Sequence, residues 1–399
     1  MRIVVAHNYY GSENPSGENN AVDFEIGMLR RYGHDVTTFN RHSDEIRSRR
    51  WTGAIRGGLA VAWNPFEASR FRKVVSAAKP DVVHVHNTFP LISPSIFWAL
   101  GNGAAAVLTL HNYRLFCAAA MLMRDGQPCT KCLDESSVLS GLRFGCYRNS
   151  RIATLPLANS IALHRAIGTW QKKVNAFIAF TEFQRQKLVA AGLPASRLHV
   201  KPHAVSGMPQ PVSWDLRDDS VVYVGRLTPE KGVEHLIRAW IELGDDAPRL
   251  RIVGDGPLRP FLTQLVAEGR ARNVTFLGTV APNLAVEEIS RAKLVIIPST
   301  GFEGFPLVLL DALAWGTPCA VSNLGSLPTI VEHGGNGLVF EPGDFRAISK
   351  LIRLVWRDTE QLKRLSVGAR KTFAEQYTEE INHRRLMDIY SAAIGGRAG

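Results

Sequence analysis

The 399-residue sequence predicts an α/β protein built from two doubly wound, Rossmann-like domains. Three observations support this prediction. Short apolar segments that are typical of buried strands alternate with amphipathic helical segments along both halves of the chain. The chain is longer than one ordinary hydrophobic core, so two domains are expected. Prolines and glycines accumulate near the middle, in VKPHAVSGMPQP, where we expect the join.

The N-terminal half opens with the strand pattern RIVVAHNYY. Apolar residues then recur at helical spacing, at Val22, Ile26 and Leu29, before the next strand pattern, HDVTTFN. Further strands are predicted at DVVHVHN, AAAVLTLH and AFIAFTE. We expect this domain to cover residues 1–205, and a C-terminal helix at about residues 376–395 to pack back on it.

The C-terminal half repeats the plan over residues 206–375. Its predicted strands are SVVYVGRL, LRIVGDG, VTFLGTV and KLVIIPS, with the helical patterns VEHLIRAWIEL and FLTQLVAEG between them. Two doubly wound domains are expected to face each other across a cleft, and ligands bind such sheets at the carboxyl ends of the strands. The residues at those predicted ends are His111, Arg226, Gly254, Asp255 and Ser299.

The segment VIIPSTGFEGFPLVLLDALAWGTPCAV carries the most specific chemistry. Glu303 lies in a Gly-rich loop after a predicted strand, and Asp311 follows with seven residues between the two acids. A helix is predicted to begin near Pro306, because proline suits a first helical position. Helix starts attract anions, and an acid inside the helix can accept hydrogen bonds from hydroxyls. The arrangement therefore suits a phosphorylated sugar nucleotide.

Net charge is +11 and is unevenly distributed. Residues 1–210 carry 25 basic and 13 acidic side chains, whereas residues 211–399 carry 22 and 23, so the first half is expected to meet an acidic partner. Its densest basic segment places Arg47, Arg49 and Arg50 among tryptophans, which suits an anionic membrane surface and equally an ordinary solvated loop and helix. No nucleic-acid recognition motif accompanies this charge, so no nucleic-acid partner is expected.

The first residues, MRIVVAHNYY, favour a strand over a signal peptide, because polar residues follow the short apolar run at once. No apolar run approaches the roughly 18 residues of a membrane span. We expect a cytoplasmic protein, with the basic segment as the candidate for peripheral attachment to the inner face of the membrane.

Six motifs in order carry a resemblance to a known family: SGENNAVDFEIGMLRRYGHDV, PDVVHVHN, TLHNYRLFC, YVGRLTPEKG, IVGDGP and GFEGFPLVLLDALAWGTP. The chain resembles the retaining glycosyltransferases of the GT-B fold, and among them family 4, over nearly its whole length. The resemblance implies transfer of a sugar from a nucleotide-diphosphate sugar, with UDP- and GDP-sugars as the main candidates, to a hydroxyl acceptor. It places the donor in the C-terminal domain and the acceptor against the N-terminal one, and implies no catalytic metal.

The resemblance also implies residue roles. Arg226 and Lys231 match the family's diphosphate ligands, and cations fixed there stabilise the charge that grows as the glycosidic bond breaks. Glu303 matches the acid near the transferred sugar's hydroxyls. Asp311 matches the acid that contacts the ribose, where relatives most often have glutamate. His111 matches the N-domain histidine that approaches the donor sugar.

Backbone contacts complete the expected donor site. Gly17 belongs to the N-terminal loop that approaches the diphosphate in relatives, although the usual glycine pair reads Ser-Gly here. Gly254 lies in the IVGDGP turn. Many relatives have glycine where this chain has Pro306, which donates no N–H. The amides of Phe305 and Leu307 remain as candidate donors to the ligand.

Four of the five cysteines cluster in the spacing C-x11-C-x2-C-x13-C, at Cys117, Cys129, Cys132 and Cys146. The pattern is compatible with a structural zinc site, with free buried thiols, or with a disulfide or redox role. In relatives of this subgroup the segment often looks similar, which favours a zinc ion that braces an acceptor-side loop. Cys319 is expected in the core.

The expected function is sugar transfer to a sugar, lipid-linked or small-molecule hydroxyl, in the assembly of a cell-surface polysaccharide, a glycolipid or a glycosylated metabolite. Two alternatives stay open. One is a protein of the same fold that binds without turnover. The other is an enzyme of different chemistry on that fold, such as a sugar-nucleotide epimerase or a phosphorylase.

Overall fold

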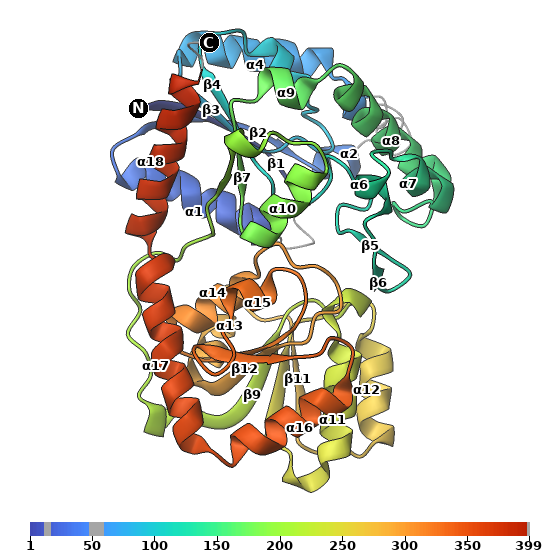
Figure 1. Cartoon of the computed structure of the whole chain (residues 1–399), viewed down its shortest axis with the longest axis vertical. Helices are drawn as coiled ribbons and strands as arrows, with labels where there is room; N and C mark the ends of the chain where they lie inside the picture. Colours follow the sequence, from blue (N-terminus) through green and yellow to red (C-terminus); the bar gives the residue numbers. More distant parts are fainter. Residues whose placement is uncertain (12–16, 48–59, 397–399) are drawn as a thin grey trace. The chain divides into compact units, whose positions relative to one another are not determined.

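The computed structural model describes residues 1–11, 17–47 and 60–396 (Figure 1). The chain divides into two compact units. The first unit consists of Met1–Leu122, Thr130–Pro202 and Glu380–Gly399. The second unit consists of Met123–Cys129 and His203–Glu379.

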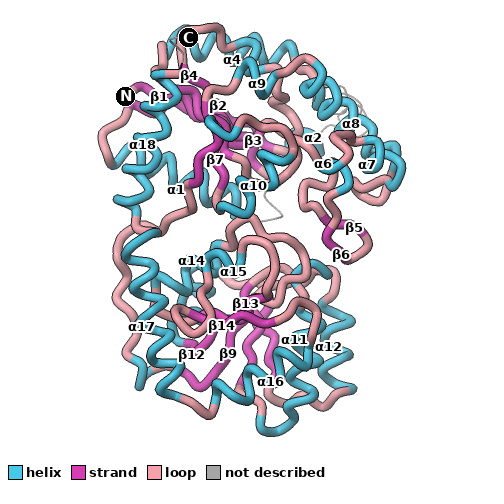
Figure 2. Tube along the Cα trace, viewed as in Figure 1, coloured by secondary structure: helices cyan, strands magenta, loops and turns pink. Residues whose placement is uncertain are grey.

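Six parallel strands form the sheet of the first unit, in the order β2-β1-β3-β4-β7-β8. Their bounds are β1 Arg2–Tyr9, β2 Asp35–His42, β3 Val82–Asn87, β4 Ala105–Thr109, β7 Ala176–Ala179 and β8 Leu198–Val200. The central strands are buried along their whole length, as parallel strands covered on both faces are. Figure 2 shows these strands side by side with helices around them.

Helices of the first unit lie between these strands, with one exception from the end of the chain. They are α1 Gly17–Arg31, α2 Asp44–Arg47, α4 Pro65–Ala78, α5 Ile96–Ala99, α6 Lys131–Asp134, α7 Leu139–Phe144, α8 Arg151–Ala166, α9 Thr169–Lys173, α10 Glu182–Ala190 and α18 Glu379–Gly395. One core layer joins Val22, Ile26 and Leu29 of α1 and Tyr390 of α18 to the central strands. The C-terminal helix thus packs on the first unit.

The second unit contains a sheet of the same kind, with six parallel strands in the order β11-β10-β9-β12-β13-β14. The strands are β9 Asp218–Val224, β10 Arg249–Val253, β11 Val274–Gly278, β12 Ala292–Ile297, β13 Cys319–Ser322 and β14 Gly337–Phe340. The helices are α11 Val233–Leu243, α12 Arg259–Glu268, α13 Pro282–Arg291, α14 Leu307–Ala314, α15 Leu327–Ile330, α16 Phe345–Trp356 and α17 Thr359–Gln376. A two-stranded hairpin, β5 Met123–Arg124 and β6 Gln127–Pro128, belongs to this unit.

The predicted fold class is confirmed: each unit is a doubly wound parallel sheet with helices on its faces. The apolar stripe of α11, with Leu236, Ile237 and Trp240 fully buried, packs with the α16 stripe on one face of the second sheet. Within the described residues, no helix is both long enough and apolar enough to cross a bilayer.

Candidate active site

Two loops at the carboxyl edge of the second sheet are held together by backbone contacts. The loop after β9 turns through Gly232, whose φ is +67°. A Cβ at Gly232 would lie 1.9 Å from the carbonyl oxygen of Pro298, at the end of β12, so only glycine permits this approach. The amides of Thr300 and Gly301 donate to the carbonyl oxygen of Glu230, at 2.9 and 3.1 Å. The loop that carries Lys231 is thereby fixed against the loop that carries Glu303.

Lys231 and Glu303 form an ion pair at this edge. The Lys231 Nζ lies 2.7 Å from Glu303 Oε1, and the Ser299 hydroxyl donates to the same oxygen at 2.6 Å. Ser326 donates to the Glu303 carbonyl oxygen at 2.6 Å, which fixes the loop backbone. Burial alone raises the pKa of Glu303, but Lys231, Ser299 and Arg226 more than offset this effect and hold it below its ordinary value. Glu303 is therefore a carboxylate at neutral pH.

Arg226 lies beside this pair, at the end of β9. Its side chain is 68% exposed, and its guanidinium is 3.9 Å from Glu230 Oε1. The Tyr223 hydroxyl donates to the Arg226 carbonyl oxygen at 2.9 Å. Gly254, at φ +125°, lies so close to this loop that a Cβ would be 2.0 Å from the Gly225 carbonyl oxygen. Arg226, Lys231, Gly254 and Glu303 are thus brought together, with one cation paired and the other directed to solvent.

Helix α14 begins at Leu307, with Pro306 in an extended conformation as the preceding residue. The Phe305 side chain is buried and packs against His203 and Tyr377, with ring centroids 5.8 and 5.5 Å away. Phe305 can therefore offer only its backbone to a ligand. Asp311 lies in the second turn and is half-buried. Burial raises the pKa of Asp311 to about 6.

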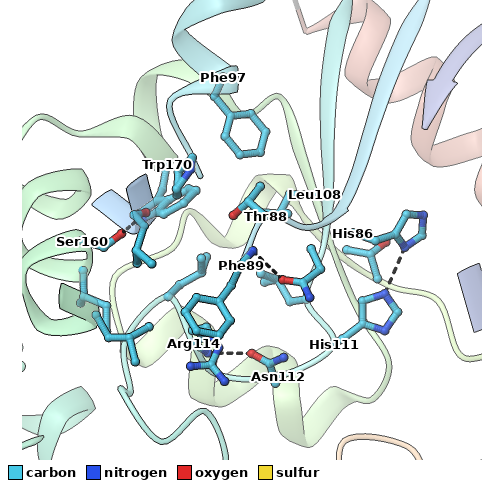
Figure 3. A pocket seen from close by; sticks show the side chains of 18 residues that line it. His86, Thr88, Phe89, Phe97, Leu108, His111, Asn112, Arg114, Ser160 and Trp170 are labelled. Carbon is cyan, nitrogen blue, oxygen red and sulfur yellow. Dashed lines mark hydrogen bonds between the residues drawn. The ribbon is translucent and has the colours of Figure 1, made fainter. Parts of the chain in front are cut away.

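His111 follows β4 at the carboxyl edge of the first sheet and lines a cavity of about 70 Å³ (Figure 3). His86 Nδ1 and His111 Nε2 lie 3.0 Å apart, and the Phe180 ring meets His111 edge-on. The wall opposite is largely apolar and aromatic, and Arg114 stacks its guanidinium over Phe89 at 4.4 Å. The cavity thus combines hydrogen-bonding imidazole and amide groups with an apolar wall.

Two predicted features adjoin residues outside the described part of the chain. Gly17 is the first residue of α1 and is exposed, but the loop before it, residues 12–16, lies outside the description. The basic segment with Arg49 and Arg50 falls in residues 48–59 and the side chain of Arg47 is likewise not described. Both assignments stay predictions.

The structure describes all four cysteines of the predicted zinc site. Cys117 and Cys132 are buried and Cys146 is half-buried, all in the first unit. Within the described chain, these three sulfurs do not meet within 4.8 Å of one another. Cys132 instead faces the backbone of α7 at Gly141, and Cys129 belongs to the second unit. The four-cysteine zinc site stays a prediction, and no role is derived from zinc. Cys319 is fully buried in β13.

Sequence reasoning missed a buried polar cluster next to His111. Glu25 lies on the buried face of α1 and its carboxylate contacts His84, His86 and Lys201. The available signal was a glutamate inside the apolar stripe of a predicted helix, where charged residues are rare unless paired. His84 is fully buried and hydrogen-bonds Tyr390 and Thr109.

Two family models match successive parts of the chain: Glycosyltransferase Family 4 over residues 25–206 and Glycosyl transferases group 1 over residues 208–372. Among curated relatives, an exopolysaccharide phosphotransferase of Streptomyces coelicolor is 35% identical over 195 residues, which are 48% of this chain and 20% of the relative. The alpha-D-kanosaminyltransferase of Streptomyces kanamyceticus is 29% identical over 236 residues, 55% of this chain and 61% of the relative. The matches thus span less than two thirds of either relative.

Among solved structures, HepE of Anabaena in complex with UDP superimposes with a TM-score of 0.68 at 19% identity, over 98% of this chain and 100% of that chain. The same protein is also known with UDP-glucose. Likeness at this level of identity establishes the fold, which is the GT-B fold. The match extends over both units.

Proposed function

The chain belongs to the family 4 glycosyltransferases, and we propose that it transfers a sugar, with retained anomeric configuration, from a nucleotide-diphosphate sugar to a hydroxyl acceptor. One observation carries the proposal. The Lys231–Glu303 pair is held at the carboxyl edge of the second sheet by a glycine turn that no other residue can adopt. This edge is where doubly wound sheets bind ligands.

The ion pair and its neighbours suit the two ends of such a donor, which are the diphosphate and the sugar. Lys231 and the exposed Arg226 supply the positive charge that a departing nucleoside diphosphate requires. Glu303, kept ionised by Lys231, is a hydrogen-bond acceptor for sugar hydroxyls. Asp311 is assigned to the ribose hydroxyls and the amides of Phe305 and Leu307 to the phosphates. Gly254, which packs against the Gly225 backbone, is assigned to the same ligand.

The first unit supplies His111 for the donor sugar and the adjoining cavity for the acceptor. We place acceptor activation on a phosphate oxygen of the donor, because the family implies front-face departure of the nucleotide. The residues of the chain then position both substrates and exclude water from a donor that is prone to hydrolysis.

A UDP-sugar is the preferred donor, and GDP-sugars are the next class. HepE, which shares the fold, was solved with UDP and with UDP-glucose, and this supports a uridine nucleotide. The acceptor is proposed to be a sugar, lipid-linked or small-molecule hydroxyl in the assembly of a polysaccharide, glycolipid or glycosylated metabolite. The names of the relatives support this range. The proposed location is the cytoplasm, with attachment to the inner membrane face through the basic half.

The experiment is a thermal-shift and hydrolysis screen of the purified protein against UDP-, GDP-, ADP- and dTDP-sugars. Stabilisation by one nucleotide family with slow release of that nucleotide is expected. Stabilisation without release, and without transfer to any acceptor tried, would indicate a binding protein. Conversion of the free nucleotide sugar to an isomer would indicate an epimerase. The absence of any response would remove the donor site from the proposal.

A further inference from the structure

A chain of buried polar groups runs through the first unit and ends at His111. Lys201 Nζ lies 2.9 Å from Glu25 Oε2, and His86 Nε2 lies 3.2 Å from Glu25 Oε1. On its other side, His86 Nδ1 lies 3.0 Å from His111 Nε2 (Figure 3). The side chains of Lys201, Glu25 and His86 are 3%, 8% and 2% exposed. Bulk water therefore contributes little to the solvation of these three side chains.

Burial and ion pairing determine the charges of Glu25 and His86. Burial alone raises the pKa of Glu25, but Lys201 and the neighbouring imidazoles hold it well below its ordinary value. Burial, with a contribution from the neighbouring His84, lowers the pKa of His86 to about 4. Glu25 is therefore an anion near neutral pH, whereas His86 is neutral and carries a single ring proton.

The position of that proton follows from what each ring nitrogen faces. An ionised carboxylate only accepts hydrogen bonds, so the nitrogen that faces Glu25 is stable only when it carries the proton. The Nε2–Oε1 contact at 3.2 Å falls short of hydrogen-bond geometry, and no other acceptor among the described residues hydrogen-bonds to this nitrogen. A proton on Nδ1 instead would turn a lone pair of His86 toward a buried anion, which is strongly unfavourable. His86 is therefore protonated on Nε2.

The proton on His111 follows in turn. With Nε2 protonated, His86 Nδ1 can only accept, so His111 must donate its Nε2–H across the 3.0 Å contact. A neutral His111 then keeps Nδ1 as its acceptor nitrogen. This is the arrangement by which a buried carboxylate orients an imidazole through the hydrogen bond on its far nitrogen.

A metal site is the main alternative for this cluster, because Glu25, His84 and His86 bring one ligand atom each within 4.8 Å. The Lys201 ammonium already compensates the Glu25 charge at 2.9 Å and hydrogen-bonds Asn382 at 3.0 Å. His84 also uses both nitrogens, toward Tyr390 and Thr109. The Lys201 ammonium thus already provides the positive charge that a metal ion would bring to Glu25.

We propose that Glu25 and His86 are positioning residues that fix His111 in the tautomer with its proton on Nε2 and its acceptor on Nδ1. In its neutral form this tautomer has Nδ1 as its acceptor nitrogen, which suits a hydroxyl that donates, as a sugar hydroxyl does, better than a phosphate or carbonyl oxygen. This inference rests on the proposed function for the identity of the ligand. The tautomer itself does not depend on it.

The test is nitrogen NMR of the full-length protein labelled with ¹⁵N-histidine, with the His111 ring signals assigned by their loss in His111→Gln. At neutral pH the wild type is expected to show His111 protonated on Nε2. His86→Leu removes the acceptor and should shift His111 toward a mixture of tautomers. His86→Gln can donate to Glu25 and accept from His111, and should restore the wild-type signals.

His164→Leu is the matched control, because His164 is equally buried in the first unit and makes two hydrogen bonds, to Thr169 and Ala62. It is expected to reduce stability without changing the His111 tautomer. A wild-type His111 protonated on Nδ1, or a His111 tautomer unchanged in folded His86→Leu, would overturn the proposal.

A kinetic measurement separates this inference from the proposed function. With the donor found in the screen, His86→Leu should lower turnover roughly 10-fold to 100-fold at nearly constant donor KM, and His86→Gln should recover most of it. Equal turnover in His86→Leu and wild type would overturn the positioning role. If no nucleotide sugar is turned over but the tautomer is as expected, the proposed function fails and the assignment of the His111 proton stands.

Discussion

The carboxyl edges of the two sheets differ in the chemistry that they present. In the first unit the edge carries the buried imidazoles of His7 and His86, which burial keeps neutral, and the Glu25–Lys201 ion pair lies beside His86. In the second unit the edge presents the Lys231–Glu303 ion pair and the exposed Arg226. Neutral hydrogen-bonding groups suit hydroxyls, whereas fixed cations suit phosphates, so two edges built on one sheet architecture suit different ligands.

The contrast also shows that net charge does not locate the phosphate site. The excess of basic residues lies in residues 1–210, whereas residues 211–399 are almost neutral. The cations assigned to the diphosphate nevertheless belong to the near-neutral half. What matters is that a cation is held in place by backbone geometry, and this is a local property of one loop.

The largest effect is expected from Lys231→Ala, which removes the fixed charge that distinguishes the second edge. Turnover of the donor should fall about 100-fold to 1,000-fold, because removing one preorganised contact to the developing charge slows catalysis by about that factor. Lys293→Ala is the matched control. Lys293 lies near the N-terminal end of β12 and pairs with Asp219 at 2.9 Å. Its side chain is 22% exposed, compared with 24% for the side chain of Lys231. Normal turnover by a folded Lys231→Ala protein would falsify the diphosphate role.

The second-largest effect is expected at Gly232, whose backbone holds the loop that carries Lys231. Gly232→Ala places a Cβ on the Pro298 carbonyl oxygen at positive φ, and should lower the free energy of unfolding by about 3 kcal/mol or more. Gly33→Ala also changes a glycine at positive φ, +80°, but meets no atom within 4 Å, and should lower it by only about 1 kcal/mol. Chemical denaturation of both variants measures the difference. Equal losses of unfolding free energy in the two variants would mean that the close contact with the Pro298 carbonyl oxygen adds nothing to the cost.

A fall in pH is also expected to change the stability of the two units in opposite directions. Burial lowers the pKa of both His7 and His86 to about 4. These histidines bind protons more readily in the unfolded chain, so their contribution to stability is complete above about pH 6.5 and is lost as the pH falls toward 4. At pH 5 the loss is about 2 kcal/mol for each histidine.

In the second unit, burial raises the pKa of Asp311 to about 6. The folded state then binds this proton more readily, so stability gains as the pH falls from about 6 toward 4. Hydrogen exchange followed by mass spectrometry at pH 7.5 and pH 5 resolves the two units. The first unit is expected to lose protection at pH 5 before the second, and the reverse order would contradict the assignment of the neutral buried imidazoles.

The smallest effect concerns Asp311 alone. Asp311→Asn keeps the shape but removes a carboxylate that burial disfavours, so the free protein should gain about 1 to 2 kcal/mol of stability at pH 7.5. The same change should weaken nucleotide binding several-fold if Asp311 contacts the ribose. Thermal unfolding with and without UDP measures both quantities. A variant that binds UDP as wild type does would remove Asp311 from the donor site.

Much of the fold was predictable because its signals are local. The alternation of strands and helices fixed the class, and the spacing of Val22, Ile26 and Leu29 gave the buried face of α1. The proximity of Lys231 and Glu303 also follows from local rules, since both lie in loops that leave the carboxyl ends of adjacent strands, β9 and β12.

Other features could not be read in this way. The Phe305 side chain turned out to be buried, while only its amide can face a ligand. The spacing of four cysteines suggested a metal, and this stays a prediction because Cys129 belongs to the other unit. Sequence spacing limits which groups can meet, whereas convergence depends on the path of the chain between them.

The sequence by itself determined the two doubly wound units and the residues at their strand ends, because hydrophobic periodicity and glycine turns act over a few neighbouring residues. Only the tertiary structure decided that Glu25, His86, His111 and Lys201 form one chain of contacts. These residues come from α1, β3, the end of β4 and the end of β8, and they meet only when the sheet and its covering helix have formed. Burial then fixes their charges, because a carboxylate without water must find its partners within the fold.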